Sequence, residues 1–304
     1  MPAKNEGRSE SADASSDAMA MFGPHVVALI DFLGQSTELA KWDYLPAALS
    51  PSHPWVQAVR DTLGRVMMWR EEFQKRYGEF QSEMDDLANY RSVGQPDHLR
   101  RQFDEYRKTS LHAAHFSDTL IFYSQLQNER GYRQMSNVCR MIVISGALML
   151  AALNAKTVFR GAIEAGMLTR FPTGDPYGPA LAKAHQLESK VADYPRIVVG
   201  PGVLSYLDAV EQAEGTDPPI RAIQEVAARC RTYLGQDFDG RWMVDYLNDA
   251  FANTCGDPTA WRKLQADGLV FVQAELTRFR KEGNEKLVRR YQRLEDYFQT
   301  RTPK

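Results

Sequence analysis

The sequence predicts an α+β protein built around one mixed β-sheet. Three observations support this fold class. Short runs of apolar and β-branched residues, typical of buried strands, recur along the chain. Segments with helical periodicity separate these runs. A heptad pattern after the first strand and an amphipathic pattern near the C-terminus predict a long helical insertion and C-terminal helices.

The composition is that of a globular protein, and it limits the possible classes of function. Hydrophobic residues make up 43% of the 304 residues and charged residues 25%, which excludes a wholly disordered or fibrous chain. The formal net charge of −2 provides no overall basic field, so we expect no nucleic-acid partner. Cys139, Cys230 and Cys255 lack a CxxC spacing. They predict buried thiols in a reducing cytosol rather than a disulfide framework or a zinc ribbon.

The sequence has neither the pattern of an export signal nor that of a membrane span. Residues 1–21 are rich in Ser and Ala, carry mixed charges and lack an apolar core, which predicts a disordered tail. The most apolar stretch, residues 138–155, contains Arg140 and falls short of the ~20 clean apolar residues that a membrane span needs. We therefore expect a cytoplasmic protein with no membrane partner.

The main domain is expected over residues 22–250, with a helical insertion over about 36–109 and a C-terminal helical extension over 251–304. The domain begins with residues 25–32, an apolar run with β-branched residues that predicts a buried strand. Asp31 lies at the end of this run and Gly34 follows it. A carboxylate at a strand end, next to a glycine, is a suitable place for chemistry.

The insertion contains a heptad seam over about five heptads. Nine of its ten seam positions are apolar, and at ~1.5 Å per residue the helix would be about 50 Å long. Two readings remain open: a coiled-coil arm for dimerisation, or a helical hairpin within the chain closed by residues 96–108. Because that segment is much shorter than the seam, we expect a second chain or the C-terminal helices to help cover it, and we predict a homodimer. The seam positions are Val56, Leu63, Arg70, Tyr77 and Met84, with Val59, Val66, Phe73, Phe80 and Leu87.

The rest of the chain returns to short strands and helices. Residues 110–116 and 119–124 predict two strands that meet at an acidic turn, Ser117-Asp118. After them we expect a helix, a strand, a helix, a strand and a hairpin, over 132–153, 157–165, 178–191, 196–199 and 233–247 in turn. The hairpin turns at Asp239-Gly240. The remainder is expected to be helical, with an apolar stripe at Leu287, Tyr291, Leu294 and Phe298.

Four segments, in this order, resemble the catalytic domain of class III nucleotide cyclases: IDFLGQS (30–36), HFSDTLIFY (115–123), FRGAIEAG (159–166) and YGPALAKAHQLES (177–189). In that family the first strand supplies one metal-binding carboxylate, and the turn between the second and third strands supplies another. An RxGIxxG strand and a helix with an N-x-A-x-R-x-E pattern follow. The resemblance covers residues 22–35 and 110–247. It does not cover the heptad insertion or the C-terminal helices.

The resemblance implies that Asp31 and Asp118 are the catalytic carboxylates and hold two Mn²⁺ or Mg²⁺ ions, with Phe32 also at the metal. A cyclase makes the 3′-hydroxyl of a nucleoside triphosphate attack its own α-phosphate and releases pyrophosphate, and hard divalent ions need carboxylate oxygens. The backbone of Phe32, Leu33 and Gly34 would lie against the phosphates. From the residues alone, the alternative is a pair of strand-end aspartates that cap local amides.

The chain departs from the family at four functional positions. The two base-reading positions hold Ala114 and Pro179, whose side chains cannot hydrogen-bond a purine. The Asn and Arg that stabilise the transition state fall on Ala182 and Gln186, and neutral Gln186 cannot supply the charge of the Arg. Arg160 matches a strand arginine that we expect to be structural. Conceivable replacement cations, each with a surface role as the alternative, are Lys183, His185, Arg196 and Arg241.

The pattern is most similar to a divergent branch of the family, the bacterial Pycsar pyrimidine cyclases of anti-phage defence. This similarity implies that UTP or CTP is converted to a 3′,5′-cyclic nucleotide at a site shared between two subunits. The alternative is a catalytically inactive cyclase-like module that binds nucleotide or acts through its helices. The implied substrate contacts are Phe32, Leu33, Gly34, Ala114, Pro179, Gln186 and Arg241.

Overall fold

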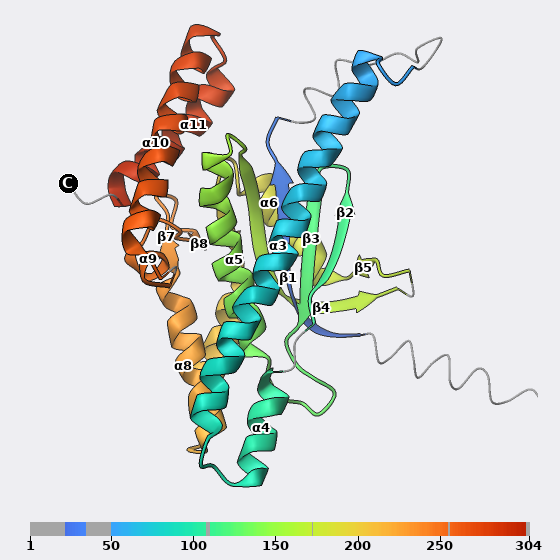
Figure 1. The fold of residues 1–304 in the computed structure, drawn as a ribbon, viewed down its shortest axis with the longest axis vertical. Coiled ribbons are helices and arrows are strands. Elements are labelled where there is room, and N and C mark those ends of the chain that lie inside the picture. The colour runs from blue at the N-terminus through green and yellow to red at the C-terminus, as the bar shows by residue number, and fades with distance from the viewer. Residues whose placement is uncertain (1–21, 35–49, 108–109, 172, 255, 302–304) are drawn as a thin grey trace, which may run out of the picture.

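A mixed sheet forms the centre of the protein (Figure 1). The computed structural model describes residues 22–34, 50–107, 110–171, 173–254 and 256–301, with the backbone alone over 81–92. Within these residues the sheet has eight strands: seven lie in the order β2-β3-β1-β4-β6-β8-β7, and the eighth, β5, pairs with the end of β4. The predicted α+β class, with one mixed sheet and several helices, is confirmed. The strands are β1 (Phe22–Phe32), β2 (His112–Phe116), β3 (Thr119–Gln125), β4 (Phe159–Arg170), β5 (Pro176–Tyr177), β6 (Ile197–Val199), β7 (Leu234–Gln236) and β8 (Trp242–Val244).

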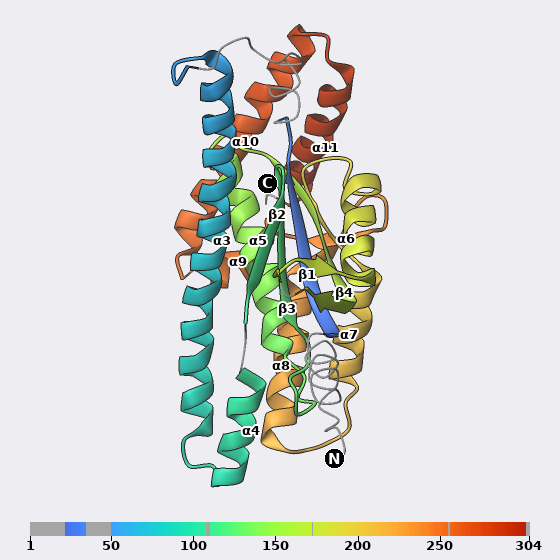
Figure 2. The same ribbon diagram turned by 90° about the vertical axis from the view of Figure 1, so that its right-hand side faces the viewer.

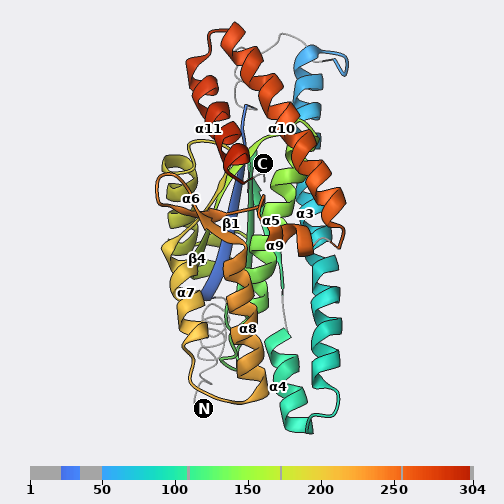
Figure 3. The ribbon, with the colours of Figure 1, turned by 90° about the vertical axis from the view of Figure 1, so that its left-hand side faces the viewer.

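The helices flank and extend this sheet. Two of them, α3 and α5, cover one face and α6 covers the other, as Figure 2 shows. A hairpin of α10 and α11 lies at one end of the molecule (Figure 3). The helices are α3 (Pro54–Ser92), α4 (Asp97–Arg107), α5 (Met135–Asn154), α6 (Pro179–Lys190), α7 (Pro201–Glu211), α8 (Pro218–Thr232), α9 (Asp249–Thr254), α10 (Pro258–Lys281) and α11 (Glu285–Arg301).

The strand β1 is central and runs antiparallel to both of its neighbours, β3 and β4. With α3 between β1 and β2 and α5 between β3 and β4, these strands form a βαββαβ unit, the ferredoxin-like arrangement. The register places Thr119 of β3 and Arg160 of β4 on either side of Asp31. Gly161 makes the β1–β4 pairing possible, because a Cβ there would lie 2.6 Å from the carbonyl oxygen of Leu29.

Alternation along β1 directs its side chains to two apolar clusters. Val27 and Leu29 pack with Tyr123, Leu168 and residues of α6. The intervening side chains, from Val26 to Phe32, enter the larger core with α3 and α5. Continuing the alternation, Asp31 points to the α6 face.

The apolar stretch predicted as a buried helix forms α5. It is the one described helix long and apolar enough to cross a membrane, and 83% of its apolar window is buried within the protein. Side chains from α10 and α11, including Leu276 and Phe298, belong to the same core as α5. The helix is therefore a core element.

The predicted long helix exists as α3, and its described seam packs within the chain. The ring of Phe73 stacks on Phe122 of β3 at a centroid distance of 3.7 Å, and Trp69 meets Phe159 edge-on at 5.2 Å. The hydroxyl of Tyr77 donates to Asn137 of α5. The sheet and α5 therefore cover Phe73 and Tyr77, whereas the sequence led us to expect that a second chain or the C-terminal helices would help cover the seam. The side chains of Met84 and Leu87 lie outside the described residues.

Several elements differ from the sequence prediction. The helices α7 and α8 were not predicted, although a proline opens each of them and apolar residues recur at helical spacing. The strand β4 extends five residues beyond the predicted end at 165, and β5 was missed. The predicted hairpin forms β7 and β8, with Gly240 in its turn at φ 75°. The tail 1–21 and the first part of the insertion, residues 35–49, lie outside the described residues.

Candidate functional site

Asp31 lies at the end of β1, on the α6 face of the sheet. Its Oδ1 accepts a hydrogen bond of 3.0 Å from the hydroxyl of Thr119, and its Oδ2 lies 3.3 Å from Nη2 of Arg160. The side chain is 18% exposed. Burial raises the pKa of Asp31, while Thr119 and Arg160 oppose this shift by stabilising the charged form.

The second predicted carboxylate, Asp118, lies in the turn between β2 and β3. Ser117 before it adopts a left-handed conformation, with φ 54°, and this closes the hairpin. The negative charge of Asp118 also raises the pKa of Asp31. The structure therefore brings the two predicted carboxylates to the same end of the sheet, within electrostatic reach of each other.

A cavity of about 850 Å³ lies between α6 and the sheet, beside Asp118. Its size is in the ordinary range for small-molecule sites. Gly178 allows the chain to turn into α6, because it adopts φ 148° and a Cβ there would lie 2.9 Å from the carbonyl oxygen of Met167. The lining is mostly apolar and consists of Leu29, Phe116, Ser117, Asp118, Thr119, Ile121, Tyr177, Gly178, Pro179, Leu181, Ala182 and His185.

Two aromatic side chains at this cavity are unusually exposed. Phe116 at the end of β2 is 79% exposed, and Tyr177 of β5 is 65% exposed. Large apolar side chains grouped at a cavity mouth favour an interaction with a ligand or a partner.

The predicted base-reading residues differ in their placement. Pro179 lines the cavity. Ala114 pairs with Ile121, a lining residue, but is not itself part of the lining. Alternation along β2 places Ala114 on the same face of the sheet as Phe116.

The loop predicted to hold phosphates has limited free backbone. Phe32 is buried, with its ring edge-on to Phe159 at 4.7 Å. The N–H of Leu33 already donates to the carbonyl oxygen of Val158 at 2.9 Å. Gly34 is exposed, adopts φ 97° and has open space where a Cβ would be. Within this loop, Gly34 is therefore the residue best able to approach a ligand.

Gln186 and Arg241, two further predicted substrate contacts, do not line the cavity. Gln186 is exposed on α6, next to the lining residue His185. Arg241 is exposed in the β7–β8 turn, where its N–H donates to Asp239. The structure therefore does not bring these two side chains together with Asp118.

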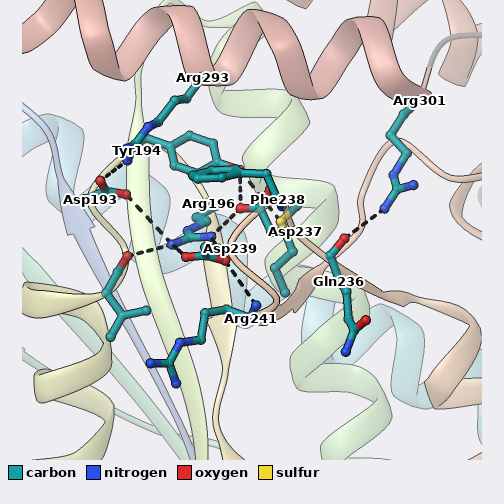
Figure 4. Close-up of polar contacts among 12 residues, drawn as sticks. Asp193, Tyr194, Arg196, Gln236, Asp237, Phe238, Asp239, Arg241, Arg293 and Arg301 are labelled. Carbon is teal, nitrogen blue, oxygen red and sulfur yellow. Dashed lines mark hydrogen bonds and ion pairs between the residues drawn. The ribbon is translucent and has the colours of Figure 1, made fainter.

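Arg196, one of the conceivable replacement cations, is buried in a separate cluster. Its guanidinium pairs with Asp237 and Asp239 of the β7–β8 turn and donates to the carbonyl oxygen of Val191 (Figure 4). The ion pairs with Asp237 and Asp239 hold the turn in place. Of the four cations considered from the sequence, His185 is the one that lines the cavity.

Two residues not assigned to the site from the sequence connect to Asp31. Nε of Arg160, at the start of β4, lies 2.7 Å from Oε1 of Glu188 on α6. Burial raises the pKa of Glu188 to about 7; Arg160 opposes this shift, and the charges of Asp31 and Asp118 add to it. Both residues lie in segments that resemble the cyclases, and Glu188 matches the Glu of the helix pattern. That match was the signal available in the sequence.

The C-terminal hairpin adds a cation near the same carboxylates. Arg290 of α11 has its pKa lowered, first by burial and then by the positive charge of Arg160, while Asp193 and Asp31 oppose the shift. Three residues further along α11, Arg293 pairs with Asp193, and its guanidinium lies 4.9 Å from the ring centroid of Phe238 (Figure 4). These contacts fix α11 next to the segment that follows α6.

The donor set fits a hard divalent cation that is shared with a substrate. Within the described ranges, no group of three or more His, Cys, Asp or Glu side chains is arranged to hold a metal ion. Mg²⁺ is usually bound by one or two carboxylates together with substrate phosphates, rather than by a cage of protein ligands. Asp31 and Asp118 are carboxylates of this kind, although Arg160 already contacts Asp31.

Comparisons with protein-family models, with curated proteins and with solved structures give no significant match for this chain.

Proposed function

We propose that this protein is a divergent nucleotide cyclase of the class III type, which converts UTP or CTP to a 3′,5′-cyclic nucleotide and pyrophosphate. The observation that carries the proposal is the convergence of Asp31 and Asp118 at one end of the sheet, beside the 850 Å³ cavity. These residues come from separate segments, the end of β1 and the turn between β2 and β3.

In the proposed mechanism, different residues of the chain bind the metal, orient its ligand and contact the substrate. Asp31 and Asp118 would hold Mg²⁺ or Mn²⁺, which when bound lowers the pKa of the ribose 3′-hydroxyl and neutralises the triphosphate. Thr119 orients Asp31 through its hydrogen bond. Gly34 offers exposed backbone to the phosphates. The cavity between α6 and the sheet would hold the nucleoside.

The character of the cavity supports a pyrimidine substrate. Pro179 presents no side-chain donor or acceptor to a purine edge, and Ile121 and Leu181 make the walls apolar. Phe116 and Tyr177 supply aromatic rings on which a base can stack. Discrimination among bases would then rest on shape, on backbone groups and on His185.

We further propose a cytoplasmic homodimer that signals in bacterial anti-phage defence. The exposed aromatic side chains at the cavity mouth support a partner surface there, since a second subunit would bury them and complete a shared site. Two residues of the described seam of α3, Phe73 and Tyr77, are covered within the chain and offer no surface to a second subunit.

A second candidate is a catalytically inactive cyclase-like module. Two observations favour it: Gln186 lies away from the cavity and carries no charge, and Arg160 already contacts Asp31. Such a module would bind a nucleotide in the same cavity without cyclising it.

Incubation of the purified protein with each of the four nucleoside triphosphates and Mn²⁺, followed by product chromatography, tests the proposal. We expect cyclic UMP or cyclic CMP from the wild-type protein and none from Asp31→Asn. Nucleotide binding without turnover by the wild type would favour the inactive module.

A further inference from the structure

The guanidinium of Arg160 is shared between two carboxylates. Its Nε lies 2.7 Å from Oε1 of Glu188 and 3.4 Å from Oδ2 of Asp31, and its Nη2 lies 3.3 Å from the same Oδ2. The shorter contact is therefore to Glu188. Arg160 is 18% exposed and the Glu188 side chain 5% exposed, so both side chains are largely removed from water.

This sharing matters for cation binding at Asp31. A divalent ion and a guanidinium compete for the same carboxylate oxygens, because both are positive and both take the lone pairs. Asp31 must give up Arg160 to become a metal ligand. A largely buried guanidinium without an anion is strongly unfavourable, so its release from Asp31 needs another partner.

We propose that Glu188 is a positioning residue that keeps Arg160 paired while Asp31 binds a divalent cation. The geometry supports this role because Arg160 can leave Oδ2 of Asp31 and retain its shorter contact with Glu188. The inference rests on the proposed function insofar as that function places a cation at Asp31. It assigns no metal contact to Glu188 itself.

A double-mutant cycle can distinguish a role of Glu188 that acts through Arg160 from a role as a metal ligand. In Glu188→Gln, Arg160 keeps Asp31 as its one anionic partner, so the cation must compete with a tighter contact. In Arg160→Gln that competition is gone. If Glu188 acts through Arg160, adding Glu188→Gln to Arg160→Gln changes little. If Glu188 is itself a ligand, its loss weakens cation binding in both backgrounds.

The experiment measures Mn²⁺ affinity by electron paramagnetic resonance of the free ion, with Mn²⁺ alone as the probe. The variants are wild type, Glu188→Gln, Arg160→Gln and the double variant, with thermal unfolding to confirm that each is folded. Glu129→Gln is the matched control, because Glu129 is exposed and follows β3 at the opposite end of that strand from Thr119.

We expect Glu188→Gln to weaken Mn²⁺ binding by about 10-fold or more, in the range seen for residues that support metal ligands. The double variant should bind within about threefold of Arg160→Gln, and Glu129→Gln should match the wild type. Equal losses from Glu188→Gln in both backgrounds, no loss in either, or no Mn²⁺ binding by the wild type would each overturn the inference. If the four proteins bind Mn²⁺ as expected but no cyclic nucleotide forms, this inference stands and the proposed cyclase activity is rejected.

Discussion

The hydroxyl of Thr119 donates a hydrogen bond of 3.0 Å to Oδ1 of Asp31, and so joins the start of β3 to the end of β1. The antiparallel register pairs these two residues directly. Thr119 also lines the cavity beside α6, whereas Asp31 does not. The hydrogen bond therefore connects the central carboxylate to the space in which we propose that the nucleotide binds.

Replacing Thr119 by Val should make cation binding at Asp31 need a higher pH. The hydrogen bond from Thr119 lowers the pKa of Asp31, so its loss raises that pKa further above the ordinary value. Because a carboxylate must be ionised to bind a metal, the pH midpoint of Mn²⁺ binding should rise. Thr119→Ser, which keeps the hydroxyl, should retain the wild-type midpoint. An unchanged midpoint in Thr119→Val would contradict the role given to this bond.

Replacing Asp31 by Asn should abolish metal-dependent turnover and leave the fold nearly intact. Asn keeps the shape of Asp and can still accept from Thr119, but it lacks the negative charge that a divalent ion needs. The loss should exceed the roughly 10–100-fold cost of removing a supporting residue. Initial rates and circular dichroism measure the two effects. Retention of a tenth of the wild-type rate would remove Asp31 from the catalytic machinery.

The ionisation of Glu188 should make folding stability fall as the pH rises. Burial raises the pKa of Glu188 from its ordinary value of 4.5 to about 7, so the folded state holds this proton more tightly than the unfolded state. The contribution is fully present below about pH 4.5 and is lost as the pH rises to about 7. Urea unfolding of wild type and Glu188→Gln at both ends of this range measures the difference. A stability difference that does not change with pH would argue against the raised pKa.

Replacing Phe73 by Ala should destabilise the protein by roughly 3–5 kcal/mol, because the ring is fully buried against Phe122. Leu63, another seam position on α3, is 51% exposed. Its replacement by Ala should change the free energy of unfolding by no more than about 0.5 kcal/mol. Urea denaturation followed by circular dichroism measures both. Similar costs at the two positions would mean that α3 packs differently, for example against a second chain.

The sequence predicts those parts of the fold that depend on local patterns. The run that ends at Asp31, the turn at Asp118 and the apolar helix α5 each show their type in consecutive residues. By contrast, α7 and α8 lie between the short strands β6 and β7 and were not predicted. The helical spacing of their apolar residues, and Pro201 and Pro218 at their first positions, were the signals available.

The parts of the candidate site that were missed depend on contacts between distant segments. The resemblance selected Asp31 and Asp118, and the register of β1 with β3 explains their proximity. Nothing in the local sequence shows that Arg160 lies between Asp31 and Glu188, because the three residues come from β1, β4 and α6. The same limitation applies to the helix α11, whose docking brings Arg290 near Asp31.

The most direct test of the central claim is a competition among the four nucleoside triphosphates. Equimolar ATP, GTP, CTP and UTP are incubated with the protein and Mn²⁺, and cyclic nucleotides and pyrophosphate are quantified by chromatography and mass spectrometry. Asp118→Asn serves as the control. The account predicts that cyclic UMP or cyclic CMP forms in equal amount with pyrophosphate, exceeds any cyclic purine nucleotide, and is lost in Asp118→Asn. Preferential cyclisation of ATP or GTP would contradict the proposed substrate. The absence of every cyclic product would contradict the proposed activity.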